Sequence, residues 1–111
     1  MKKDNRLHLF DIFEAIEKIG EYTKGVSHGS FQKDEMMQDA VIRQLAIIGE
    51  SANRLTKSFL KENPDFPVRE AVSMRNLLVH EYDMVNEALV WETIQNDLPD
   101  LKKKVKHFMT D

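Results

Sequence analysis

Hydrophobic side chains recur every three or four residues along most of the chain, and polar side chains fill the positions between them. This spacing is typical of amphipathic α-helices, because it gathers the apolar side chains on one face. It predicts helices over about residues 7–22, 34–60, 67–80, 86–97 and 100–109. No stretch has the strict alternation of a half-buried strand, so we expect an all-α fold of four to five helices.

Turn-forming residues predict where these helices begin and end. Residues 25–30 contain glycine and serine without periodicity, which predicts a loop after the first helix. Pro64 and Pro67 should end the long central helix, with Pro67 in the first turn of the next. Asn86 is the expected N-cap of the fourth helix. Pro99 should break or kink that helix, so the last helix is expected from about residue 100.

Composition limits the class of protein. A chain of 111 residues is large enough for one hydrophobic core, so residues 1–111 are expected to form one domain. The chain has no cysteine, which excludes disulfides, thiolate zinc sites and a cysteine nucleophile and fits a reducing cytoplasm. Charged residues interrupt every apolar run, so no membrane contact is expected. The net charge of −3 argues against a nucleic-acid coat protein but allows a local basic site.

The main candidate chemistry lies at the end of the third predicted helix, in residues 74–82. Arg75 is always charged, His80 titrates near neutral pH and Tyr82 offers a phenolic donor. These groups could hold a phosphate and transfer a proton beside it. On an ideal helix Arg75 and Tyr82 share a face, whereas His80 lies about 140° round from Arg75. The helix must therefore loosen near His80, or a second molecule must supply the missing group.

Several other residues have weaker indications. Gly49 lies inside the central helix, where glycine costs about 1 kcal/mol relative to alanine, and we expect it to mark a close contact between helices. Glu50 and Asn53 lie on the polar face of that helix, where they are solvated or line the site. The lysines of residues 102–106 are interpreted as a solvated face, with RNA contact as the alternative. His28 is interpreted as an exposed loop histidine without partners, and no metal-ligand cluster or cofactor motif is found.

The motif resembles the signature of a known family, the HepT-like toxins of the HEPN superfamily. These are small helical proteins encoded beside a minimal nucleotidyltransferase antitoxin. The signature is arginine, a polar residue, a short spacer, histidine, any residue and tyrosine, and it is matched without departure by Arg75, Asn76, Leu77-Leu78-Val79, His80, Glu81 and Tyr82. The resemblance extends to residues 41–50 and 90–99. It implies a HEPN-type up-and-down helical bundle that forms a homodimer, with residues 1–111 as a single HepT-like HEPN domain.

The resemblance also implies a function. The protein would be the toxin of a type VII-like toxin–antitoxin pair, a metal-independent endoribonuclease that needs no cofactor. Arg75 and His80 would be catalytic during attack of the RNA 2′-hydroxyl on the neighbouring phosphorus. Asn76 would orient the phosphate or His80, and Tyr82 would shape the site. In related pairs the partner nucleotidyltransferase adds AMP to the motif tyrosine, which here is Tyr82.

A second class of function uses the same fold. The protein could be a non-catalytic helical subunit that presents a nucleotide or a protein to a nucleotidyltransferase. Purely structural roles are a separate alternative, in which His80 caps the carbonyl groups of its own helix and Tyr82 is a core aromatic residue. The intact pair of Arg75 and His80 favours the ribonuclease, because an adaptor does not need it.

Overall fold

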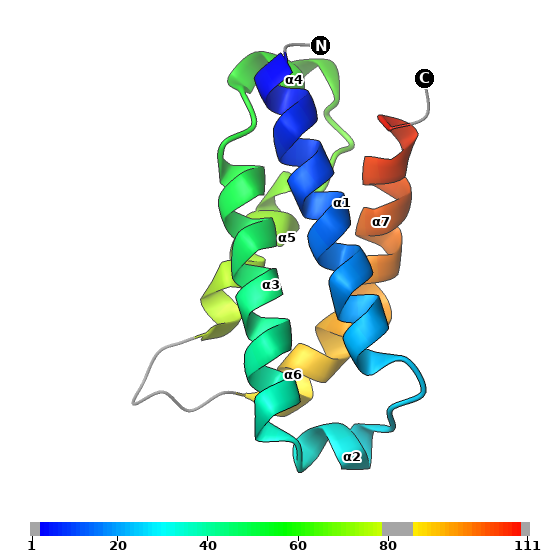
Figure 1. Ribbon diagram of the computed structural model, residues 1–111. Helices are drawn as coiled ribbons and strands as arrows, with labels where there is room; N and C mark the ends of the chain where they lie inside the picture. The colour runs from blue at the N-terminus through cyan, green and yellow to red at the C-terminus, as the bar shows by residue number, and fades with distance from the viewer. Residues whose placement is uncertain (1–2, 79–85, 110–111) are drawn as a thin grey trace.

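The computed structural model describes residues 3–78 and 86–109, and all regular secondary structure within those ranges is helical (Figure 1). The all-α prediction is confirmed for these residues, but the α-helices outnumber the four to five expected, because some are short. None of the described helices is long and apolar enough to cross a membrane. The elements in chain order are α1 (Lys3–Thr23), α2 (His28–Gln32), α3 (Glu35–Asn53), α4 (Lys57–Glu62), α5 (Val68–Ser73), the 3₁₀ helix η1 (Met74–Leu78), α6 (Glu87–Glu92), the π-helix η3 (Thr93–Asp97) and α7 (Leu98–His107).

The long helices run alternately up and down. Figure 1 shows α1 and α3 side by side in opposite directions, with α5 returning from the α4 end and α7 running back toward it. The first turn of α1 and the last turn of α7 therefore lie at the same end of the bundle. This arrangement has the up-and-down order that the family resemblance implies.

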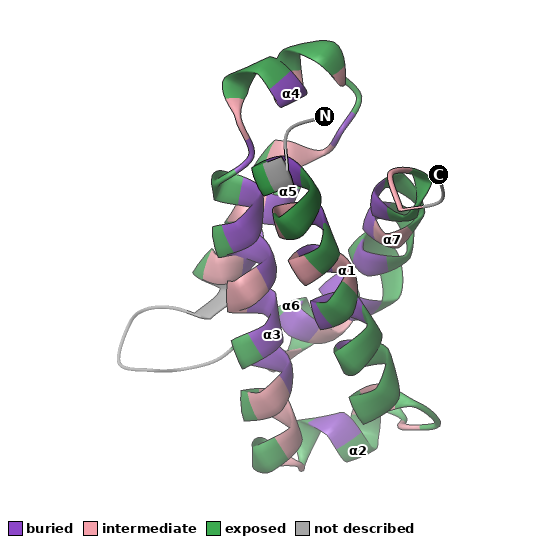
Figure 2. Ribbon diagram, turned by 45° about the horizontal axis from the view of Figure 1, so that its top comes forward, coloured by how far each residue is buried: buried purple, intermediate pink, exposed green. Residues whose placement is uncertain are grey.

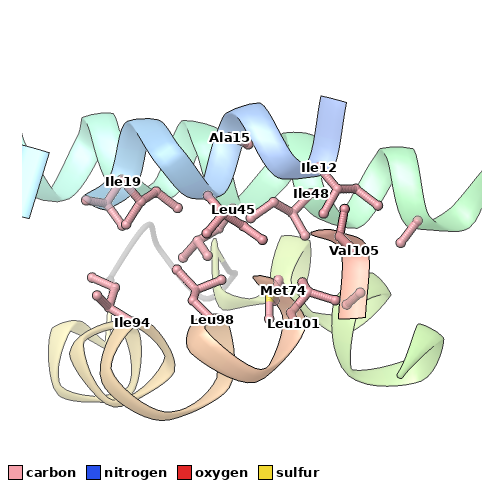
Figure 3. Close-up of a cluster of buried hydrophobic side chains, with 14 of the residues drawn as sticks. Ile12, Ala15, Ile19, Leu45, Ile48, Met74, Ile94, Leu98, Leu101 and Val105 are labelled. Atoms are coloured by element: carbon pink, nitrogen blue, oxygen red, sulfur yellow. The ribbon is translucent and has the colours of Figure 1, made fainter. Parts of the chain in front are cut away.

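One hydrophobic core joins these helices. Figure 2 shows the buried residues on the inward sides of α1, α3 and α7 and the exposed ones on their outward sides, as amphipathic periodicity requires. Met74 of η1 lies in the same cluster as side chains of α1, α3 and α7 (Figure 3). Its members include Ile12, Ala15, Ile19, Leu45, Ile48, Ile94, Leu98, Leu101 and Val105.

Two predicted boundaries in the first half of the chain are wrong. Residues 25–30 do not form one loop, because α2 begins at His28 and is capped by Ser27, whose hydroxyl accepts a hydrogen bond from the Ser30 amide. The predicted helix over 34–60 is two helices, since α3 ends at Asn53 and α4 begins at Lys57. Hydrophobic periodicity continues from α3 into α4, but the Thr56 cap interrupts the helical backbone between them.

Pro99 was predicted to break or kink the fourth helix, and the break is wrong, although Figure 1 shows that the chain changes direction between α6 and α7. The chain passes from α6 through η3 directly into α7, with Pro99 in the first turn of α7. A proline in a first turn is tolerated, because the amide hydrogen that it lacks would have no partner there. The intervening turn adopts π-helical geometry, which is a recognised way of accommodating an irregularity inside a continuous helix.

A buried amide explains the break between α3 and α4. Asn5 of α1 is only 2% exposed. Its amide nitrogen donates to the Thr56 hydroxyl at 3.0 Å, and its amide oxygen accepts from the Thr56 backbone N–H at 3.0 Å. The Thr56 hydroxyl in turn accepts from the Phe59 amide at 3.2 Å, which caps α4. The Asn5 oxygen thus replaces the backbone acceptor that the Thr56 N–H would have had in a continuous helix.

We expect Asn5→Ala to destabilise the protein by about 1–3 kcal/mol, because it removes two hydrogen bonds and leaves the half-buried Thr56 backbone N–H without its partner. Urea unfolding followed by circular dichroism measures the difference. Asn96→Ala, at an exposed position of η3, is the matched control and should change the free energy of unfolding much less. Equal losses in the two variants would show that the Asn5 hydrogen bonds do not stabilise this corner.

Candidate functional site

The structure places two of the four predicted site residues. Arg75 and Asn76 lie in η1, where Arg75 is half-buried and Asn76 is exposed. His80 and Tyr82 lie outside the described residues, so the arrangement of the four is not tested. The described part of the motif is therefore η1, which we call the arginine turn, together with the residues of other helices that pack against it.

The backbone leaves α-helical geometry before the motif histidine. α5 ends at Ser73 and η1 continues as a 3₁₀ helix from Met74. A 3₁₀ helix has about 3.0 residues per turn and rises about 2.0 Å per residue, whereas an α-helix has about 3.6 residues per turn and rises about 1.5 Å. The angles calculated for an ideal α-helix therefore do not apply beyond Arg75. A departure from α-helical geometry was expected near His80, and it begins six residues earlier.

Gly49 of α3 allows this turn to pack directly against α3. A Cβ atom built on Gly49 would lie 2.7 Å from the Arg75 Cβ, 2.9 Å from the Arg75 nitrogen and 2.9 Å from the Val72 carbonyl oxygen. These distances are too short for any side chain, so the backbone of η1 reaches α3 only because residue 49 is glycine. The predicted close helix contact at Gly49 is confirmed. The contact fixes the backbone position from which the Arg75 side chain projects.

Met74 fixes the other side of the same turn. Its side chain is 3% exposed and packs in the core with Leu98 and Leu101 of α7 (Figure 3). Burial of a methionine contributes about 1.5–3 kcal/mol. Because Met74 points into the core and Gly49 contacts the next residue, Arg75 has a constrained backbone at the edge of a packed region.

An acidic cavity adjoins Met74. It has a volume of about 190 Å³ and includes Glu70 of α5, Asp97 of η3 and Asp100 of α7 in its lining. Burial, followed by the charges of Glu92, Asp100 and Glu70, raises the pKa of the Asp97 carboxyl. This side of the turn is therefore unfavourable for a phosphate group.

The chain is anchored again where α6 begins. The Asn86 side chain accepts from the Leu89 amide at 3.1 Å, which confirms the predicted N-cap. Glu87 accepts from Gln32 at 3.1 Å and contacts the His28 ring nitrogen at 3.2 Å. The residues between η1 and this anchor, 79–85, include both motif residues that the structure does not describe.

His28 is not the isolated loop histidine that was predicted. Besides its contact with Glu87, its ring stacks on Trp91 with centroids 5.4 Å apart and planes 3° apart. Glu87 and Trp91 are about sixty positions away in the sequence, so periodicity around His28 could not indicate them. His28 is a structural contact between α2 and α6.

Two further candidates lie on α3. Glu50 and Asn53 are exposed there, and Glu50 directly follows the Gly49 that contacts Arg75. Within residues 3–78 and 86–109, no group of three or more histidine, aspartate or glutamate side chains could hold a metal ion.

Comparison with known proteins identifies the family. Residues 12–108 match the family model described as ribonuclease HepT-like. The chain belongs to the ribonuclease HepT-like family. Residues 12–108 include both the Gly49 contact and the arginine turn, so the described site lies inside the region that this HepT-like chain shares with the family.

Full-length relatives agree with this assignment. A probable ribonuclease HepT of Thermococcus cleftensis is 40% identical over 104 residues, which cover 94% of each chain. A protein of Caldanaerobacter subterraneus subsp. tengcongensis named as a putative RNase is 38% identical over 96% of each chain. A second protein named as a putative RNase, from Methanocaldococcus jannaschii, is 35% identical over 95% of this HepT-like chain and 96% of the relative. No solved structure matches the chain significantly.

We expect Gly49→Ala to destabilise this HepT-like protein by about 1–3 kcal/mol, because the added methyl group overlaps the backbone of η1. Gly20→Ala is the matched control, since a Cβ on Gly20 would meet nothing within 4 Å. Alanine at that interior helix position should stabilise the protein by about 0.5–1 kcal/mol. Chemical denaturation of both variants measures the two changes. A stabilising Gly49→Ala would contradict the close contact.

Proposed function

We propose that the protein is a metal-independent endoribonuclease and the toxin of a type VII-like toxin–antitoxin pair. Membership of the ribonuclease HepT-like family supports RNA as the substrate. The observation that carries the proposal is the constrained arginine turn, in which Gly49 and the core fix the backbone of Arg75. His80 follows Arg75 by five residues. A cation and a proton-transfer group are the parts that cleavage of RNA without a metal requires.

In the proposed reaction the RNA 2′-hydroxyl oxygen attacks the adjacent phosphorus. A bond forms between phosphorus and the 2′-oxygen, and the bond from phosphorus to the 5′-oxygen of the next nucleotide breaks. His80 takes the proton from the 2′-hydroxyl or gives one to the departing 5′-oxygen. Arg75 stabilises the negative charge on the phosphoryl oxygens, and Asn76 orients the phosphate or His80. The products are a 2′,3′-cyclic phosphate and a free 5′-hydroxyl.

The proposed active form is a homodimer. One histidine cannot at the same moment accept the attacking proton and supply the leaving one, so two copies of His80 give a base and an acid. A twofold axis through the cleft would bring two copies of Arg75 and His80 to one phosphate. The exposed Asn76 and half-buried Arg75 leave η1 accessible to a second copy.

We expect the purified protein to cleave single-stranded RNA in EDTA and to leave cyclic phosphate or 3′-phosphate ends. Arg75→Ala and His80→Ala should each lower the cleavage rate by about 100-fold or more, since each removes a charge-stabilising or proton-transfer group. Arg69→Ala, which removes an exposed arginine of α5, should retain the rate of the original protein. Gel analysis of end-labelled RNA measures the rates and the product ends.

Light scattering on the same samples should give twice the chain mass of 13.0 kDa, which checks the homodimer. Equal cleavage by all of the variants would instead indicate a contaminating nuclease. That result would favour the alternative function, a non-catalytic subunit that presents a nucleotide or a protein to a nucleotidyltransferase.

The proposed antitoxin is a minimal nucleotidyltransferase that transfers AMP to Tyr82. The chain has one other tyrosine, Tyr22, which is 37% exposed in the last turn of α1. Tyr22 is therefore a real competitor for modification and a matched control. AMP on Tyr82 would add about one negative charge and a bulky base beside Arg75, which would repel and block RNA.

Incubation with ATP, Mg²⁺ and the partner enzyme should add AMP to the original protein and to Tyr22→Phe but not to Tyr82→Phe, because only Tyr82 belongs to the motif. Intact-mass spectrometry detects the addition, and the modified protein should lose RNA cleavage. Modification of Tyr82→Phe, or full activity after modification, would show that the antitoxin acts by binding alone.

A further inference from the structure

A larger cavity lies away from the arginine turn, between the loop that follows α4 and the last turns of α7. Figure 1 shows α4 and the end of α7 at the same end of the bundle. Its volume is about 310 Å³, which is within the range of about 300–1,000 Å³ for small-molecule sites. The arginine turn instead contacts the interior of α3 at Gly49. The cavity is lined by Asn63, Asp65, Phe66, Lys103, Lys104, His107 and Phe108.

Aromatic rings form the apolar wall of this cavity. Phe59, Phe66 and Phe108 contact one another with ring centroids 5.2–6.4 Å apart. Phe59 and Phe66 are buried, whereas Phe108 is only partly buried. The two buried rings therefore support Phe108, which is the ring most available to a ligand. His107 packs edge-on against the same ring at 5.2 Å.

Lysine side chains form the polar rim. Lys104 pairs with Asp65 at 3.4 Å, and Lys102, farther along α7, pairs with Glu17 at 2.9 Å. Lys103 and Lys106 make no ion pair with a carboxylate of the described residues. The C-terminus of α7 contributes roughly half a negative charge, which does not cancel these lysines. This end is locally basic although the whole chain has a net charge of −3.

We propose that this cavity binds a flanking segment of single-stranded RNA, with a base on Phe108 and a phosphate on Lys103 and Lys104. Sites for single-stranded nucleic acid combine stacking on aromatic rings with a basic rim. This proposal depends on the proposed function in one respect, which is that RNA is the substrate. The acidic cavity at Glu70 and Asp97 lies between α5 and α7, so the RNA does not follow that surface to the arginine turn. The basic cavity is thus a separate docking site.

The probe is a fluorescent RNA of about 16 nucleotides, a length that covers most single-strand sites, in which every 2′-hydroxyl is methylated. This probe cannot undergo 2′-hydroxyl attack, so binding is measured separately from cleavage. Lys103→Gln with Lys104→Gln should weaken binding and lower the slope of log K against log salt by about 0.7 for each phosphate that is no longer neutralised. Phe108→Leu keeps an apolar side chain but removes the ring, and should weaken binding about fivefold.

Lys18→Gln with Lys24→Gln is the charge-matched control, because both lysines are exposed at a different part of the surface. This control should leave the affinity and the salt slope nearly unchanged, and circular dichroism should show that every variant is folded. Equal weakening by the two lysine pairs, or no weakening by the cavity variants, would overturn the proposal. Full displacement of the RNA by AMP would also overturn it and would assign the cavity to a mononucleotide. Failure of the original protein to cleave unmodified RNA would count against the proposed function alone.

Discussion

The candidate site depends on the absence of one side chain. Gly49 lets the backbone of η1 lie against α3, where any Cβ atom would overlap Arg75 and Val72. Because η1 lies this close to α3, the Met74 side chain reaches the core and packs with side chains of α1, α3 and α7. The packing that stabilises the bundle and the position of the arginine backbone therefore have a common origin. A substitution that loosened this contact would affect both.

A second anchor lies on the other side of the motif in sequence. α6 begins at the Asn86 cap, and contacts of Glu87 and Trp91 with His28 hold it against α2. Residues 79–85, which contain His80 and Tyr82, are thus bounded by two attachments to the bundle.

Local patterns in the sequence predicted those parts of the structure that local interactions determine. Periodicity found the main helices, the cost of an interior glycine identified the Gly49 contact, and the motif residues identified the family. Two of the errors arose where a distant residue decides the outcome. The end of α3 depends on Asn5, 51 positions before Thr56, and the role of His28 depends on Glu87, 59 positions later. No pattern within one helix contains that information.

The distribution of charge gives the arginine turn a preferred direction of approach. Glu70, Asp97 and Asp100 line the cavity beside Met74, and burial together with neighbouring carboxylates raises the pKa of Asp97. The folded protein therefore binds the proton of Asp97 more tightly than the unfolded chain does. The stability that this gives is present below the ordinary aspartate pKa of 3.8 and is lost as the pH rises through the raised pKa of the folded protein. At neutral pH this side of η1 is negatively charged and repels phosphate. If Arg75 binds the RNA phosphate as proposed, that phosphate is consequently favoured to approach from the side of η1 that faces away from this cavity.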